Sequence, residues 1–164
     1  GSKPYHMATF DMLGFNLRMS DIQAAVGVAQ MDKLEALLEE RQELAKRYDQ
    51  LISGMAELLP PVVADKCGHT YQSYVIRVAR GGIRTRNKVM EHLASLGMET
   101  RPGTHAVHRL GYYSRKYGLS PDDYPHACQA EDTSITLPMF PGMTKQDQTE
   151  VAEALRQGIE VACA

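Results

Sequence analysis

One uninterrupted helical pattern is the feature of this sequence that most limits the folds open to it. Ser20 and Gln23 have the spacing of a capping box, so the pattern has a defined start. No proline interrupts it, and we predict one long helix over Ser20–Ser53, bent near Gly27 or Met31. Its apolar stripe consists of Ile22, Ala25, Val26, Ala29, Leu34, Leu37, Leu38, Leu44, Ala45, Tyr48, Leu51 and Ile52.

The residues just before this helix alternate between apolar and polar side chains. Phe15, Leu17 and Met19 flank Asn16 and Arg18. This alternation is typical of a short extended segment, and we expect its apolar side chains to point inward and its amide and guanidinium to point outward. The residues alone leave two interpretations open, which are a helix start with a solvated face and a pair of functional groups.

The rest of the sequence alternates short β-type segments with amphipathic helical segments. We predict strands at Thr70–Ala79, Met98–Arg101 and Ser134–Leu137. We predict further helices from an N-cap at Thr85 to Gly97, within Thr104–Tyr117, over Tyr124–Asp132, and from a Thr144–Asp147 cap onward. This order predicts an α/β fold of the α+β sandwich type, in which helices pack on a small mixed or antiparallel sheet of about three strands.

The composition indicates one folded domain and argues against several classes of partner. The chain has 164 residues, of which 43% are hydrophobic and 23% are charged, and this is enough for a buried core. A net charge of −2 gives no electrostatic basis for binding nucleic acid or an anionic membrane. No apolar run has the length of a membrane span, and no signal peptide is visible. The three cysteines lie far apart, which predicts free thiols and a cytoplasmic location.

The densest group of chemically useful side chains lies between residues 101 and 113. Imidazoles, guanidiniums and phenols at this density suit the binding of phosphates, carboxylates and sugar hydroxyls. The candidate substrate-binding residues are Arg101, His105, His108, Tyr112 and Tyr113. His105 and His108 have no third ligand nearby, so we predict no metal site. The alternative is a surface loop whose polar side chains only face water.

Three stretches of the sequence form a recognisable set. They are Gly14–Ala25 (Gly-Phe-Asn-Leu-Arg-Met-Ser-Asp-Ile-Gln-Ala-Ala), His108 followed by Tyr112-Tyr113, and Leu137–Thr144 (Leu-Pro-Met-Phe-Pro-Gly-Met-Thr). Together they resemble segments of the DegT/DnrJ/EryC1/StrS aminotransferases, in which the first stretch follows the cofactor-binding domain. The resemblance extends from about Tyr5 to the C-terminus and corresponds only to the last part of such an enzyme.

The resemblance implies a fold and an activity for the parent protein. It implies the small C-terminal domain of an aspartate-aminotransferase-like fold. The parent would be a homodimeric enzyme that depends on pyridoxal phosphate and transfers an amino group from an amino-acid donor to a nucleotide-linked keto-sugar. The large domain, with the lysine that forms the Schiff base, would lie upstream of this chain.

The resemblance also implies roles for single residues. Asn16 matches an asparagine that reaches across the dimer to the cofactor phosphate, and Arg18 matches an arginine near the cofactor or nucleotide-sugar phosphates. The candidate loop matches a segment that helps to cover the substrate. His105, Ala106 and Gly111 depart from the pattern, because many members carry proline there.

We divide the chain into a leader over residues 1–19, in which Gly1-Ser2 is typical of an expression-tag scar, and a small domain over residues 20–164. No lysine has the sequence context of a Schiff-base lysine, so we expect this chain alone to be inactive. One alternative is a stand-alone binding or interaction module, which would bury the apolar stripe of residues 22–52 within one chain or a tight dimer. Another is an unrelated enzyme built on the His/Arg/Tyr loop.

Overall fold

Within residues 3–163, which the computed structural model describes, the centre of the fold is a four-stranded antiparallel sheet. Its strands are β1 (Leu58–Leu59), β2 (Tyr74–Val78), β3 (Arg101–Pro102) and β4 (Ser134–Leu137), in the order β1-β2-β4-β3. In β2, Tyr74, Ile76 and Val78 are buried, whereas Arg77 is exposed. The alternation shows that one face of the sheet packs on the core.

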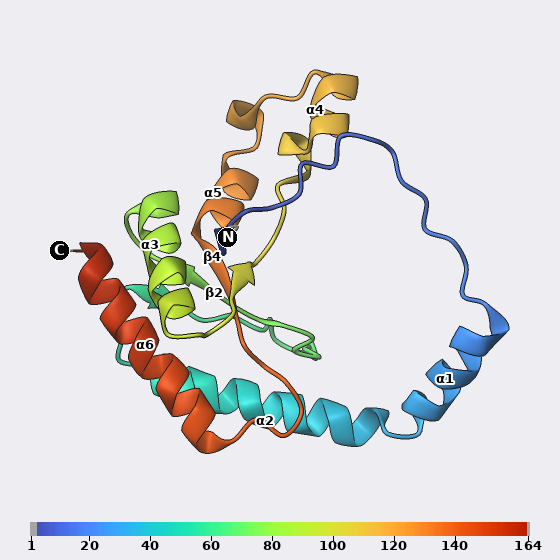
Figure 1. Ribbon diagram of the computed structural model, residues 1–164, viewed down its shortest axis with the longest axis horizontal. Helices are drawn as coiled ribbons and strands as arrows, with labels where there is room; N and C mark the ends of the chain where they lie inside the picture. Colours follow the sequence, from blue (N-terminus) through green and yellow to red (C-terminus); the bar gives the residue numbers. More distant parts are fainter. Residues whose placement is uncertain (1–2, 164) are drawn as a thin grey trace.

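Six helices accompany this sheet within the described residues. They are α1 (Asp21–Met31), α2 (Leu34–Ile52), α3 (Gly82–Ser95), α4 (Gly111–Tyr117), α5 (Pro125–Thr133) and α6 (Lys145–Cys163), with 3₁₀ turns η1 (Val107–Arg109) and η2 (Pro121–Asp123). α3 packs against α6 and α5, and α2 packs against α6 (Figure 1). α1 stands away from this body, at the far end of a long extended segment (Figure 1).

The core is filled from the sheet and from one apolar stripe on each of three helices. The stripes are Leu44, Ala45, Tyr48 and Ile52 on α2; Val89, Met90 and Leu93 on α3; and Val151, Ala152, Leu155 and Ile159 on α6. The Tyr48 ring stacks on Tyr74 with centroids 5.1 Å apart, and its hydroxyl donates to the Pro138 carbonyl at 2.7 Å. Burial raises the pKa of Tyr48, because the ionised phenolate would lose its hydration.

The prediction of one helix over Ser20–Ser53 is wrong. The chain forms two helices, α1 and α2, with a turn at Asp32–Lys33, next to the bend predicted near Met31. The Lys33 N–H donates to the Gln30 carbonyl at 3.0 Å, and this three-residue spacing tightens the backbone at the end of α1. The turn contains neither glycine nor proline, so the sequence carries no local signal for the break.

The prediction that Phe15, Leu17 and Met19 point inward is also wrong. We call residues 15–31 the apolar arm. None of the residues of α1 is buried, and Phe15 and Leu17 are 86% and 84% exposed. The large apolar side chains exposed on the arm are Phe15, Leu17, Met19, Ile22, Val26, Val28 and Met31. The first half of the predicted stripe is therefore uncovered by the described chain.

Other predicted elements are present with different bounds. The sequence did not predict β1, so the sheet has four strands among the described residues rather than about three. The strand predicted at Thr70–Ala79 shortens to β2, because Tyr71 has a φ of 46°, outside the strand region. α3 begins at Gly82, and Thr85 is buried in its first turn instead of serving as its cap. β3 covers only the end of the predicted Met98–Arg101 strand.

The α/β class, with helices packed on a small antiparallel sheet, is confirmed, and β4 has the predicted bounds. Two of the three predicted caps, at Ser20 and Thr144, are also present. The Gln23 N–H donates to the Ser20 hydroxyl at 3.4 Å, and the Asp147 N–H donates to the Thr144 hydroxyl at 3.1 Å. These caps depend only on neighbouring residues, which explains why the sequence reveals them.

Candidate functional site

Four hydrogen bonds join residues 9–11 of the leader to α4. The Gly111 and Tyr112 N–H groups donate to the Thr9 and Phe10 carbonyls at 2.9 and 3.0 Å. These are first-turn donors that α4 cannot satisfy itself, so the leader acts as its cap. Asp11 accepts two further bonds from the Arg115 guanidinium, at 2.9 Å to Oδ1 and 2.8 Å to its carbonyl. The leader thereby positions the second half of the candidate loop.

A side chain at the first position of α4 would have to displace the Asp11 carboxylate. A Cβ on Gly111 would lie 2.0 Å from the Asp11 Oδ1 atom. The departure from proline at this position therefore makes room for the Asp11 carboxylate, which bonds to Arg115 beside it.

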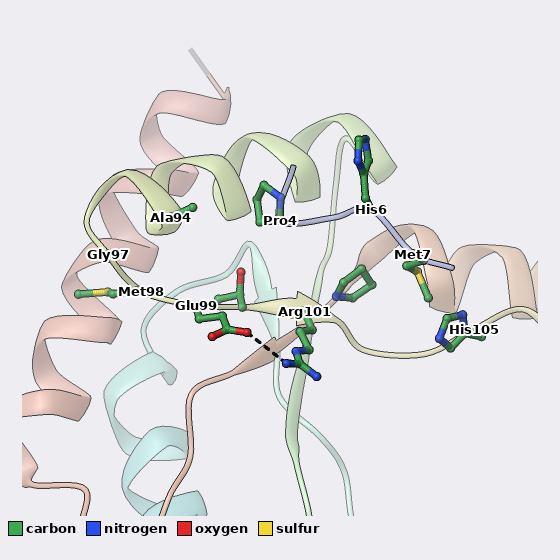
Figure 2. A pocket seen from close by; sticks show the side chains of 11 residues that line it. Pro4, His6, Met7, Ala94, Gly97, Met98, Glu99, Arg101 and His105 are labelled. Carbon is green, nitrogen blue, oxygen red and sulfur yellow. Dashed lines mark hydrogen bonds and ion pairs between the residues drawn. The ribbon is translucent and has the colours of Figure 1, made fainter. Parts of the chain in front are cut away.

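A cavity of about 580 Å³ lies between the leader and the edge strand β3. Figure 2 shows Pro4 and His6 on the segment that passes over the strand, and Arg101 on the strand itself. Arg101 forms an ion pair with Glu99 at 3.2 Å, and both side chains are about four-fifths exposed, at 79% and 81%. His105 lines the same cavity and meets the Phe10 ring edge-on at 5.3 Å. The cavity thus offers a guanidinium, imidazoles and a carboxylate to a polar ligand.

A second cavity of about 530 Å³ shares the stretch Gly97–Arg101 with the first. Its other lining residues are mostly apolar and include Leu137, Phe140, Met143 and Val151. Thr100 lines both cavities, and its buried Oγ1 atom has no hydrogen-bond partner within residues 3–163. No sequence signal singled out Thr100, because its place in the cavity walls depends on tertiary structure.

His108 lies inside the fold rather than on the cavity surface. Its side chain is only 5% exposed, and its ring stacks on Tyr124 with centroids 4.7 Å apart. Its Nε2 atom lies 3.1 Å from the Cys128 Sγ atom. The structure therefore separates His108 from Arg101 and His105, with which the sequence had grouped it.

Tyr112 and Tyr113 lie on α4, outside both cavities. Their rings meet edge-on at 5.3 Å, and Lys116 donates to the Tyr112 hydroxyl at 3.1 Å. Tyr113 is 36% exposed and stacks on Tyr117. The pair forms an aromatic surface beside the leader rather than part of the cavity wall.

Arg109 is a structural residue that the sequence analysis did not single out. Its guanidinium binds both carboxylate oxygens of Asp132, at 2.6 and 3.0 Å, and also Glu131 at 3.2 Å. The bond to Asp132 is the largest cause of the raised pKa of Arg109. This pair joins η1 to α5 and holds the candidate loop against the body.

Asn16 and Arg18 are exposed on the apolar arm, and neither lines the two cavities described above. Within residues 3–163, neither side chain has a hydrogen-bond partner. Both therefore keep their donors available for a group outside the described chain. The same range contains no cluster of three or more His, Cys, Asp or Glu side chains suited to a metal, and no helix long and apolar enough to span a membrane.

Comparison with known proteins decides the family. Residues 2–156 match the DegT/DnrJ/EryC1/StrS aminotransferase family. This chain belongs to that family. Over 158 residues it is 32% identical to GDP-perosamine synthase from Caulobacter vibrioides, covering 96% of this chain and 42% of that protein. Over 155 residues it is 31% identical to the spore coat polysaccharide biosynthesis protein SpsC from Bacillus subtilis, covering 91% and 39%.

The family member described here spans about two fifths of the length of these relatives. Solved structures show the same fold. The PMP form of a putative sugar aminotransferase from Streptococcus pneumoniae gives a TM-score of 0.81 at 24% identity, over 88% of this chain and 36% of that one. The aminotransferase PseC from Helicobacter pylori, involved in pseudoaminic acid biosynthesis, gives 0.78 at 21% identity, over 92% and 40%. The sequence-based assignment to an aminotransferase family is confirmed.

Proposed function

We propose that this chain is the small C-terminal domain of a pyridoxal-phosphate-dependent aminotransferase that acts on a nucleotide-linked keto-sugar. The 32% identity to a GDP-perosamine synthase over 96% of the chain carries this proposal. The parent enzyme takes an amino group from an amino-acid donor, and a large domain supplies the Schiff-base lysine. Alone, this chain does not catalyse the transfer.

The exposed arm supports the need for further polypeptide. Ile22 is 80% exposed and Val28 is 68% exposed, on a helix with no buried residue. Apolar side chains that gather on one exposed segment mark a surface for another protein or domain. A large domain, or the second subunit of a homodimer, is the occupant that the family suggests.

Asn16 and Arg18 fit the phosphate of the cofactor. An amide N–H₂ and a guanidinium are suitable phosphate donors, and both side chains are exposed without partners in the described chain. Pyridoxal phosphate, when bound in the parent, supplies the electron sink for the amino transfer. The role of these two residues is to bind and orient that group.

The remaining candidate residues divide into three roles. Arg101 and His105 contact the substrate from the cavity beside β3, where a guanidinium suits a phosphate oxygen. Tyr112 and Tyr113 cover the substrate from α4. His108 supports the loop from within, because its ring is buried against Tyr124.

A chimeric enzyme tests the proposal. This chain replaces the matched 42% of the Caulobacter vibrioides relative, and the purified chimera receives pyridoxal phosphate, glutamate and a GDP-linked keto-sugar. We expect mass spectrometry to detect the amino sugar. Asn16→Ala and Arg18→Ala should each weaken cofactor binding by about 10- to 100-fold, the effect of losing a charge-assisted hydrogen bond. Gln42→Ala, an exposed polar residue on α2, is the matched control.

The competing hypothesis is a non-catalytic binding module. A chimera that folds, as judged by circular dichroism, but binds no cofactor and forms no amino sugar would favour that alternative. Sedimentation of this chain alone adds a second criterion. A tight dimer that protects Ile22 and Val26 from solvent would mean that the arm is covered without a large domain.

A further inference from the structure

A cysteine and a histidine from separate elements meet beneath the candidate loop. Cys128 lies on α5, and its Sγ atom is 3.1 Å from the Nε2 atom of His108 on η1. The imidazole is held in place by the Tyr124 ring, which stacks on it with an interplanar angle of 30°. Cys128 also lies 3.3 Å from the Pro121 carbonyl of η2, so three elements converge on one sulfur atom.

The surroundings of Cys128 resemble those of an activated nucleophile. An activated thiol needs a base within hydrogen-bond reach and a third group that orients the base. His108 and Tyr124 satisfy these two conditions. Arg109 adds a positive charge, which Asp132 and Glu131 partly neutralise.

The other two cysteines of the chain lack these features. Cys67 and Cys163 are exposed free thiols, and within residues 3–163 neither sulfur has a hydrogen-bond partner. Cys128 is only partly buried. The three thiols therefore allow a comparison within one molecule between a histidine-paired sulfur and two unpaired ones.

We propose that Cys128 is a thiol-modification site that reacts with small disulfides of the glutathione class. The thiol proton moves to His108 Nε2, and the sulfur attacks one sulfur atom of the disulfide. A new Cys128–sulfur bond forms as the old disulfide bond breaks, and the departing thiolate takes up the proton. Cys128 is oxidised and the departing sulfur is reduced, so the exchange needs no further reagent.

The adduct acts on the candidate loop. The Cys128 sulfur lies against His108, so a tripeptide attached to it competes for space with the His108 ring stacked on Tyr124. η1 leads directly into α4, so the displacement loosens the segment that carries Tyr112 and Tyr113. The modification site itself does not depend on the proposed aminotransferase function.

The full chain, incubated with excess glutathione disulfide at pH 7, provides the test. Peptide mass mapping over time gives separate rates for Cys128, Cys67 and Cys163. We expect Cys128 to react at least about tenfold faster than either exposed thiol, because a positioned base typically contributes about 100-fold or more. His108→Gln should remove that advantage. Equal or slower reaction of Cys128 in the unaltered chain overturns the proposal, and this comparison needs no variant to fold.

Iodoacetamide separates reactivity from access. This neutral probe is smaller than glutathione disulfide and leaves no disulfide. Fast reaction of Cys128 with both reagents supports the proposal. Fast alkylation without mixed-disulfide formation overturns it, because the sulfur would then be reactive but closed to the proposed class of reagent. A rate unchanged in His108→Gln also overturns it, because the histidine would then play no part.

Discussion

Gly103→Ala is the substitution whose effect follows most directly from the structure. Gly103 comes immediately after β3, opposite Ser134 of β4, and it begins the loop that carries His105. A Cβ at this position would lie 2.3 Å from the Val75 Cγ1 atom and 2.8 Å from the Ser134 Cβ atom. Both distances are far below ordinary van der Waals contact. Since β4 is paired on both sides, by β2 and β3, it has no room to retreat.

The expected loss of stability combines three effects. Overpacking beside a fixed strand costs about 1–3 kcal/mol. The Gly103 N–H donates to the buried Ser134 hydroxyl at 3.1 Å, and the loss of that bond costs about 1 kcal/mol. Alanine also lowers the conformational entropy of the unfolded chain, which stabilises the folded state by about 0.4–1 kcal/mol. The net destabilisation is about 2 kcal/mol, which corresponds to a fall of about 4–8 °C in Tm for a domain of this size.

Urea denaturation followed by circular dichroism measures this difference. Gly54→Ala is the control, because no atom lies within 4 Å of its added Cβ, and its free energy of unfolding should stay the same or rise by up to about 1 kcal/mol. Val75→Ala removes the nearest obstructing atom, so it should cost less in the Gly103→Ala background than in the unaltered chain. Equal stability of Gly103→Ala and the unaltered chain would refute the reasoning, as would strict additivity with Val75→Ala.

Three further predictions concern pH, the arm and the cofactor. Burial raises the pKa of Tyr48 and Tyr74, so above about pH 10 only the unfolded chain releases their protons. The free energy of unfolding should then fall by about 1.4 kcal/mol per pH unit for each residue. Tyr48→Phe should make this fall smaller in urea titrations at pH 9 and 11. The chain should enhance the fluorescence of the apolar dye ANS, and Ile22→Ser should weaken this enhancement. Val62 is exposed outside the arm, so Val62→Ser should leave the enhancement unchanged. Equal effects of the two substitutions would contradict dye binding at the arm. Borohydride reduction with pyridoxal phosphate should give no stoichiometric adduct at a single lysine by intact mass, and such an adduct would show that this chain has a cofactor lysine of its own.

Local signals account for the elements that the sequence predicts well. β4 matches its predicted bounds because an apolar segment ends at Pro138, and α6 follows a cap made by Thr144 and Asp147. The break between α1 and α2 has no such signal, because Asp32 and Lys33 are both compatible with a helix. Its position depends on which half of the stripe finds a core to pack against, and only the second half does.

The candidate site also contains a contact that no local sequence signal predicts. Composition alone identified the segment that carries Arg101, His105 and His108, and the structure places the first two at a cavity. His108 points the other way because η1 brings it against Tyr124 and Cys128, which follow it by 16 and 20 residues. A contact of this kind has no periodic pattern in the sequence, so the spacing of the histidines could not predict it.

Strand geometry relates the apolar side chains of the arm to its two polar candidates, Asn16 and Arg18. α1 has 11 residues and buries none of them, whereas an isolated helix in water needs about 12–15 residues to be even marginally stable. Its capping box contributes only about 1 kcal/mol, so a stable arm needs a covering surface. Because side chains alternate along an extended segment, a surface that covers Phe15 and Leu17 turns Asn16 to the opposite side. In the proposed function, covering the arm would therefore also present the amide and guanidinium to a phosphate, which would account for donors without partners and uncovered apolar side chains on one segment.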